Sequence, residues 1–127
     1  MKGIFVRELP GGIPYASAIV HGHKPIETRS RRMLSGCVGD RVAVIRTGRG
    51  SPVVVGYVKI VRESFCPADR FESFRDLTLI PPGSKFDCRG RGKWFYWLSR
   101  PEWCKPYPLP AGAIRHGRSW AEWEVIA

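Results

Sequence analysis

Short apolar stretches, interrupted by Gly and Pro, recur along the chain and predict more strands than helices. Many of their residues are β-branched or aromatic, and such side chains pack well on a pleated sheet. The expected strands span residues 3–9, 41–46, 53–61, 94–99 and 119–125. Only residues 47–52 separate the second strand from the third, so these two strands are expected to form a hairpin.

Two other segments are typical of short helices. Residues 14–21 begin with Pro14 and are followed by Gly22, which suit the first turn of a helix and the position just past its end. Residues 68–77 follow Pro67 and carry phenylalanines at helical spacing. Both segments are short, so we expect the helices to lie beside the strands rather than to form a layer of their own.

The segment after the first expected helix is extended. Pro25 disfavours helical backbone at the preceding residue, Lys24, which therefore begins an extended stretch. Side chains alternate along such a stretch, so Glu27 and Arg29 share one face, and Ile26 and Thr28 point to the other.

These elements predict an α+β fold that is mostly β. Many short strands with Gly and Pro turns indicate a small closed or nearly closed β-barrel, with two or three short helices beside it. A Pro-rich connector is expected over residues 101–110, and residues 1–127 are interpreted as one domain.

The charge is strongly positive. The 127 residues include 21 Lys and Arg against 11 Asp and Glu, for a net charge of +10. Such an excess attracts polyanions, and nucleic acid is the commonest of them. The alternative is that the charge only keeps a small protein soluble.

Membrane, metal and cofactor sites are not indicated. No apolar stretch approaches the length of a membrane span, and the N-terminus becomes charged too early for a signal peptide, so a cytoplasmic protein is expected. The 4 cysteines lie at residues 37, 66, 88 and 104, without zinc-site spacing, and are expected to be free thiols. We therefore expect no metal and no cofactor; the alternative is a metal site that the cysteines share in three dimensions.

One short motif resembles a known family. Gly22-His23-Lys24-Pro25-Ile26-Glu27-Thr28-Arg29 is similar to the Gly-x-Lys-x-x-Glu-x-Arg signature of ASCH domains, and Val38-Gly39-Asp40-Arg41-Val42 follows where that family begins its next strand. A closing Trp123-Glu124 also resembles the family's C-terminus. The chain is similar to the small bacterial stand-alone type in layout and length.

The resemblance implies a PUA-like barrel that binds RNA or DNA, including modified bases. Some small members are amidohydrolases that act on N4-acetylcytidine with a Lys, a Thr and a Glu, and a ribonuclease activity has been proposed for others. Lys24 corresponds to the Lys, whereas Glu27 stands where those enzymes have Thr. Glu63 and Glu72 are the candidates for the second acid.

The residues themselves indicate compatible chemistry. Glu27 is suited to accept from the exocyclic amine of a base, and Arg29 to clamp a phosphate or a base edge. Lys24 is suited to bind phosphate, or to act as a general base if burial lowers its pKa. The alternative is a purely structural Glu27–Arg29 pair.

A wider basic set is a candidate nucleic-acid surface. Cations close to aromatic residues and glycines are typical of single-strand binders. The candidates besides Lys24, Glu27 and Arg29 are Arg31, Arg32, Arg46, Arg89, Arg91, Lys93 and Trp94. The alternative is that these are solvated loops.

Three hypotheses follow. The first is a module that binds nucleic acid, RNA in particular, or a nucleoside. The second is a small hydrolase or ribonuclease with Lys24 as base and Glu27 or Glu63 as partner. The third is a protein-interaction domain.

Overall fold

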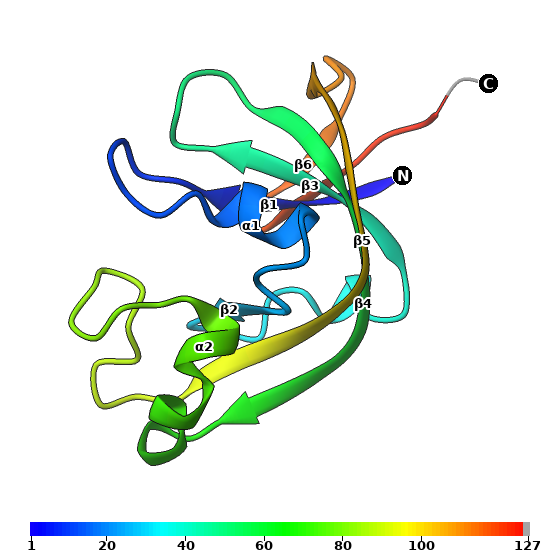
Figure 1. Cartoon of the computed structure of the whole chain (residues 1–127). Coiled ribbons are helices and arrows are strands. Elements are labelled where there is room, and N and C mark those ends of the chain that lie inside the picture. Colours follow the sequence, from blue (N-terminus) through cyan, green and yellow to red (C-terminus); the bar gives the residue numbers. More distant parts are fainter. Residues whose placement is uncertain (126–127) are drawn as a thin grey trace.

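The computed structural model describes residues 1–125, which form a mostly β fold with short helices (Figure 1). In the labels, η denotes a 3-10 helix. The elements in chain order are β1 (Lys2–Arg7), α1 (Tyr15–Val20), β2 (Ile26–Arg29), η1 (Ser35–Cys37), β3 (Arg41–Thr47), β4 (Val53–Cys66), η2 (Ala68–Phe74), α2 (Arg75–Thr78), β5 (Lys93–Pro108), β6 (Ile114–His116) and β7 (Trp120–Glu122). The five expected strands are all present with shifted ends, β2 forms in the stretch that was expected to be extended, and β6 is an additional strand.

The strands form one mixed sheet in the order β2-β5-β4-β3-β1-β7-β6. β1 and β3 are parallel, and the other neighbouring pairs are antiparallel. Within residues 1–125 no strand ladder joins β2 to β6, so the expected closure of the barrel is not seen. The sheet keeps two edges, and these edges become important for the site.

The β4–β5 hairpin departs most from the sequence prediction. β4 has 14 residues and β5 has 16, and both curve along one side of the molecule (Figure 1). β5 runs through most of the segment that was expected to be a Pro-rich connector, and Pro108 pairs with Val53. Beyond Leu98, β5 has only β4 as a neighbour, and an edge position tolerates prolines that lack an N–H. The expectation of a connector there was wrong.

The second expected helix is also different in kind. Residues 68–74 form the 3-10 helix η2, and only the last turn, α2, is α-helical. A 3-10 helix aligns residues three apart, and Phe71 and Phe74 both pack on Phe95 with ring centroids 5.9 and 5.1 Å away. The tighter helix therefore lets two rings cover one position of β5.

Strand alternation divides the core into two clusters. Ile4 lies in the larger cluster with residues of α1 and β5, whereas its neighbour Phe5 lies in a smaller cluster with Ala43 and Ile45. Among residues 1–125, no helix is long and apolar enough to cross a membrane.

Candidate functional site

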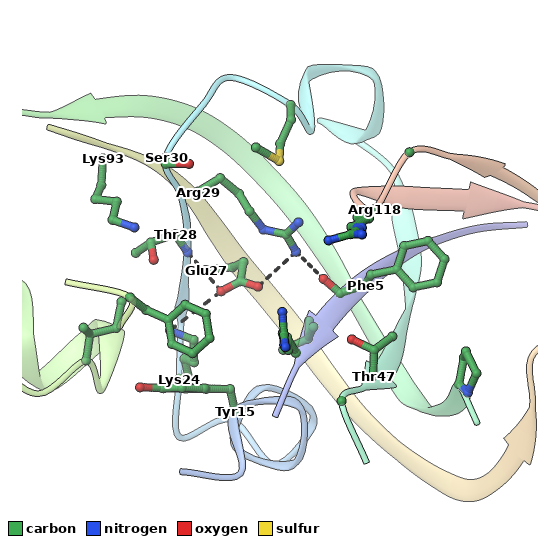
Figure 2. A pocket seen from close by; sticks show the side chains of 18 of the residues that line it. Phe5, Tyr15, Lys24, Glu27, Thr28, Arg29, Ser30, Thr47, Lys93 and Arg118 are labelled. Atoms are coloured by element: carbon green, nitrogen blue, oxygen red, sulfur yellow. Dashed lines mark hydrogen bonds and ion pairs between the residues drawn. The ribbon is translucent and has the colours of Figure 1, made fainter. Parts of the chain in front are cut away.

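A cavity of about 600 Å³ lies between the two edges of the sheet (Figure 2). Its walls come from β1, β2, the start of β5, the turn after β3, the residues around α2 and the β6–β7 hairpin. The lining residues are Phe5, Val6, Arg7, Tyr15, Lys24, Glu27, Thr28, Arg29, Ser30, Met33, Thr47, Gly48, Pro52, Ile80, Phe86, Lys93, Arg115, Gly117 and Arg118. The missing β2–β6 ladder is thus where the chain leaves room for a ligand.

The turn that ends α1 places Lys24 in the lining of the cavity. Gly22 adopts a φ of 81°, and the N–H groups of His23 and Lys24 both donate to the carbonyl of Ala18. This turn and Pro25 direct the Lys24 side chain inward, where the residue is only 2 % exposed.

The Lys24 ammonium has few polar partners for a buried cation. It donates to the carbonyl of Thr78, lies 3.8 Å from Oε1 of Glu27, and sits 5.0 Å above the ring of Tyr15. Burial lowers the pKa of Lys24 to about 8, although the charge of Glu27 opposes that shift.

Glu27 and Arg29 meet on one face of β2, as their alternation predicts. The Glu27 carboxylate accepts from its neighbour's N–H on Thr28 at 3.0 Å and from the Arg29 guanidinium at 3.2 Å (Figure 2). Arg29 also donates to the carbonyl of Phe5 and so joins β2 to β1. Thr28 borders the cavity too, although it was expected to point away, because β2 is an edge strand with the cavity beside it.

The cavity wall is strongly cationic. Among residues 1–125, Glu27 is the one carboxylate that lines it, whereas six of the lining side chains carry a positive charge: Arg7, Lys24, Arg29, Lys93, Arg115 and Arg118. Of these, the sequence prediction included Lys24, Arg29 and Lys93. Arg115 and Arg118 were missed because only the pairing of β1 with β7 and of β7 with β6 brings them to the cavity. Arg7 was missed because it ends β1, which is far from β2 in sequence and is joined to it by the Arg29–Phe5 hydrogen bond.

The other predicted binding residues do not line the cavity. They are Arg31, Arg32, Arg46, Arg89, Arg91 and Trp94. Trp94 instead packs edge-on against Phe65, with centroids 5.4 Å apart, and the guanidinium of Arg32 lies 5.6 Å above its ring. The structure therefore divides the predicted binding residues between the cavity and positions outside it, and Arg32 and Trp94 lie together among the latter.

Glu63 also lies outside the cavity. Its carboxylate accepts hydrogen bonds from Arg32 at 2.6 Å, Ser35 at 2.6 Å and the hydroxyl of Tyr96 at 2.7 Å. Partial burial raises the pKa of Glu63, but these hydrogen bonds outweigh it and the net effect is a lowered pKa. Neither Glu63 nor Glu72 is among the cavity residues, so in the part of the chain that the structure describes no second carboxylate lines the cavity with Glu27.

No metal centre is evident in the described part of the chain. Residues 1–125 contain no group of three His, Cys, Asp or Glu side chains placed to hold an ion. The four cysteines are free, and Cys37 and Cys66 are buried.

Comparisons with known proteins identify the fold. No family model and no curated protein matches the sequence significantly. Three solved structures of the ASCH protein of Zymomonas mobilis match with probability 1.00.

Each of the three matches covers most of both chains. A Tyr-to-Phe form gives a TM-score of 0.68 at 20% identity over 86% of this chain and 77% of that chain. The unsubstituted protein gives 0.63 at 18% identity over 84% and 73%, and a Ser-to-Ala form gives 0.73 at 16% identity over 96% and 88%. The chain therefore has the fold of the ASCH proteins.

Proposed function

We propose that this protein is a nucleic-acid-binding module of ASCH type that holds one base of an RNA strand, or a modified base, in the cavity. The observation that carries the proposal is the charge of the cavity: six cationic side chains face one carboxylate. A space with this imbalance attracts an anionic ligand, and phosphate groups are the anions that Arg and Lys bind best in proteins.

The size and lining of the cavity support a nucleotide. About 600 Å³ lies within the range of ordinary small-molecule sites. The rings of Tyr15 and Phe86 contribute apolar walls, on which a base can pack.

The Glu27 carboxylate offers hydrogen-bond acceptors to a base. A carboxylate has about four acceptor positions, and Glu27 uses two of them for the N–H of Thr28 and the guanidinium of Arg29. The remaining positions are free to accept from an exocyclic amine of cytosine, adenine or guanine. Arg29, fixed by Phe5 and Glu27, is a preorganised donor next to that acceptor.

Titration of a fluorescein-labelled single-stranded RNA at several salt concentrations tests the proposal. We expect the affinity to fall with salt, with a slope of about 0.7 per phosphate contacted. Arg118→Ala should lower both affinity and slope, whereas Lys105→Ala removes an exposed charge outside the cavity and serves as the matched control. Equal binding by both variants and the unaltered protein would refute a site in the cavity.

A hydrolytic activity is the second candidate, and the lowered pKa of Lys24 favours it. With a pKa of about 8, a fraction of Lys24 is neutral near pH 7 and can act as a general base on a modified nucleoside such as N4-acetylcytidine, or on an RNA 2′-hydroxyl. The rate should then rise as pH increases through about 8 and disappear in Lys24→Met. Absence of cytidine after incubation with N4-acetylcytidine, and of cleavage products from RNA, would exclude this candidate.

A further inference from the structure

Lys93 is a buried cation without a counter-ion. The residue is only 9 % exposed, and its side chain enters the cavity from the first position of β5. In the described part of the chain its ammonium makes no hydrogen bond and no ion pair. The ammonium itself still reaches solvent, because Ser84 Oγ is the only buried side-chain polar atom without a partner in the described residues. A cation that points into a cavity without a counter-ion offers a position for an anionic group of a ligand.

The two carboxylates whose charges act on Lys93 are already engaged. Glu27 is held by Arg29 at 3.2 Å and lies 3.8 Å from Lys24. Asp87 pairs with Arg75 at 2.9 Å and accepts from two backbone N–H groups, and these bonds lower the pKa of Asp87 to about 2. Both carboxylates pair with other cations, and among residues 1–125 neither forms an ion pair with Lys93.

The buried part of the cavity consequently carries uncompensated positive charge. Lys24, Arg29 and Lys93 together face the single negative charge of Glu27. In Figure 2 Lys93 and Arg118 stand at opposite sides of the cavity, with Glu27 between them. Lys93 thus offers a cationic position of its own, apart from the exposed arginine.

Building on the proposed function, we infer that the Lys93 ammonium binds a phosphate group of the ligand, so that the site selects nucleotides over nucleosides. A phosphate oxygen supplies the acceptor that Lys93 lacks, and its charge neutralises the excess beside Glu27. Glu27 and Arg29 form hydrogen bonds with the base edge, and Lys93 pairs with the phosphate. On this inference the ligand is a nucleotide or a position in an RNA strand rather than a free nucleoside.

The titration of Lys93 adds a second readout. Burial lowers the pKa of Lys93, and a bound phosphate would reverse that effect because it favours the charged ammonium. Binding of a nucleotide should therefore take up protons when the pH lies above the range in which Lys93 is fully charged. Binding of the matching nucleoside should not.

Isothermal titration of cytidine and cytidine 5′-monophosphate, into the unaltered protein and Lys93→Met, tests the inference. We expect the monophosphate to bind at least about tenfold more tightly than the nucleoside, and Lys93→Met to remove this preference. Met has similar length and no charge, so the variant should also melt at a higher temperature than the unaltered protein without ligand. Lys105→Met, on the surface, should change neither quantity.

The outcomes separate the inference from the function on which it rests. Equal affinity for cytidine and its monophosphate, or a preference that survives Lys93→Met, would overturn the phosphate role of Lys93 and leave a base-binding cavity. A lower melting temperature of Lys93→Met together with an unchanged preference would assign Lys93 a structural role. No binding of either compound and none of single-stranded RNA would overturn both the inference and the proposed function.

Discussion

Glu27 is buried and Glu63 is partly buried, and both carboxylates pair with an arginine, yet only Glu27 borders the cavity. Each accepts from an arginine and from further hydrogen-bond donors. The Glu63 carboxylate accepts from Arg32, Ser35 and Tyr96. The Tyr96 hydroxyl also accepts from the backbone N–H of Leu34, so it links Glu63 to the backbone. Around Glu27 the cations outnumber the carboxylate, and space remains beside them.

This comparison shows which feature distinguishes a candidate binding site from a structural ion pair. A Glu–Arg pair occurs in both places and does not distinguish them. What distinguishes Glu27 is unbalanced buried charge next to a cavity, because such an arrangement is costly unless a ligand completes it. The variants below test this distinction, in order of decreasing expected effect.

Glu27→Gln should have the largest effect. It leaves Lys24, Arg29 and Lys93 buried without any negative charge, and we expect a loss of about 3–5 kcal/mol in the free energy of unfolding. Urea denaturation measures this loss, which a saturating nucleotide should partly restore by supplying a phosphate. A loss below about 1 kcal/mol would contradict the account of Glu27 as the anchor of the cavity.

Lys24 should contribute to the pH dependence of the protein's stability. The pKa of Lys24 is about 8 in the folded protein and 10.5 in the unfolded chain, so between these values the unfolded chain binds more protons. The free energy of unfolding therefore rises with pH over this interval, by up to about 3 kcal/mol from this group.

Lys24→Met removes that rise and so provides the measurement. Tyrosines and cysteines titrate in the same range, but they are common to both proteins and cancel in the difference. The free energy of unfolding of Lys24→Met minus that of the unaltered protein should therefore fall from about pH 8 to about pH 10. Parallel curves for the two proteins would show that Lys24 is not perturbed.

Glu63→Gln should weaken the fold without weakening the site. The change removes charge from the bonds to Arg32, Ser35 and Tyr96, and we expect a loss of about 1–2 kcal/mol in the free energy of unfolding. Nucleotide affinity, measured by titration calorimetry at a temperature where the variant is folded, should be unchanged. A tenfold loss of affinity would place Glu63 in the function and remove the contrast with Glu27.

Arg32→Ala should have the smallest effect. The side chain of Arg32 is 63 % exposed, and exposed ion pairs contribute less than about 1 kcal/mol to stability. We expect a correspondingly small change in urea denaturation and no change in mononucleotide affinity. A larger loss of stability would mean that the Arg32–Trp94 contact matters more than its exposure indicates.

Local sequence signals predicted the geometry around Lys24, Glu27 and Arg29 in the cavity. Pro25 fixed where the helix ends, and strand alternation placed Glu27 beside Arg29, because both effects act over a few residues. Arg115 and Arg118 gave no such signal. They reach the cavity only through the pairing of β6 with β7 and of β7 with β1, which no local pattern encodes.

The fold shows the same limit. The hairpin strands β3 and β4 were predicted from their β-branched residues. β6 was missed because its three residues are all exposed and show no alternation, and β5 was cut short because proline usually marks a loop. The opening between β2 and β6 could not be predicted, since closure depends on how the whole sheet curves.

A crystal structure with a bound nucleoside 5′-monophosphate tests the central claim most directly, namely that the cationic cavity is a nucleotide site. The account predicts the phosphate within about 3 Å of the Lys93 ammonium and the base edge facing Glu27 and Arg29. A nucleotide bound elsewhere on the surface, or a cavity that stays empty at a saturating concentration, would contradict it.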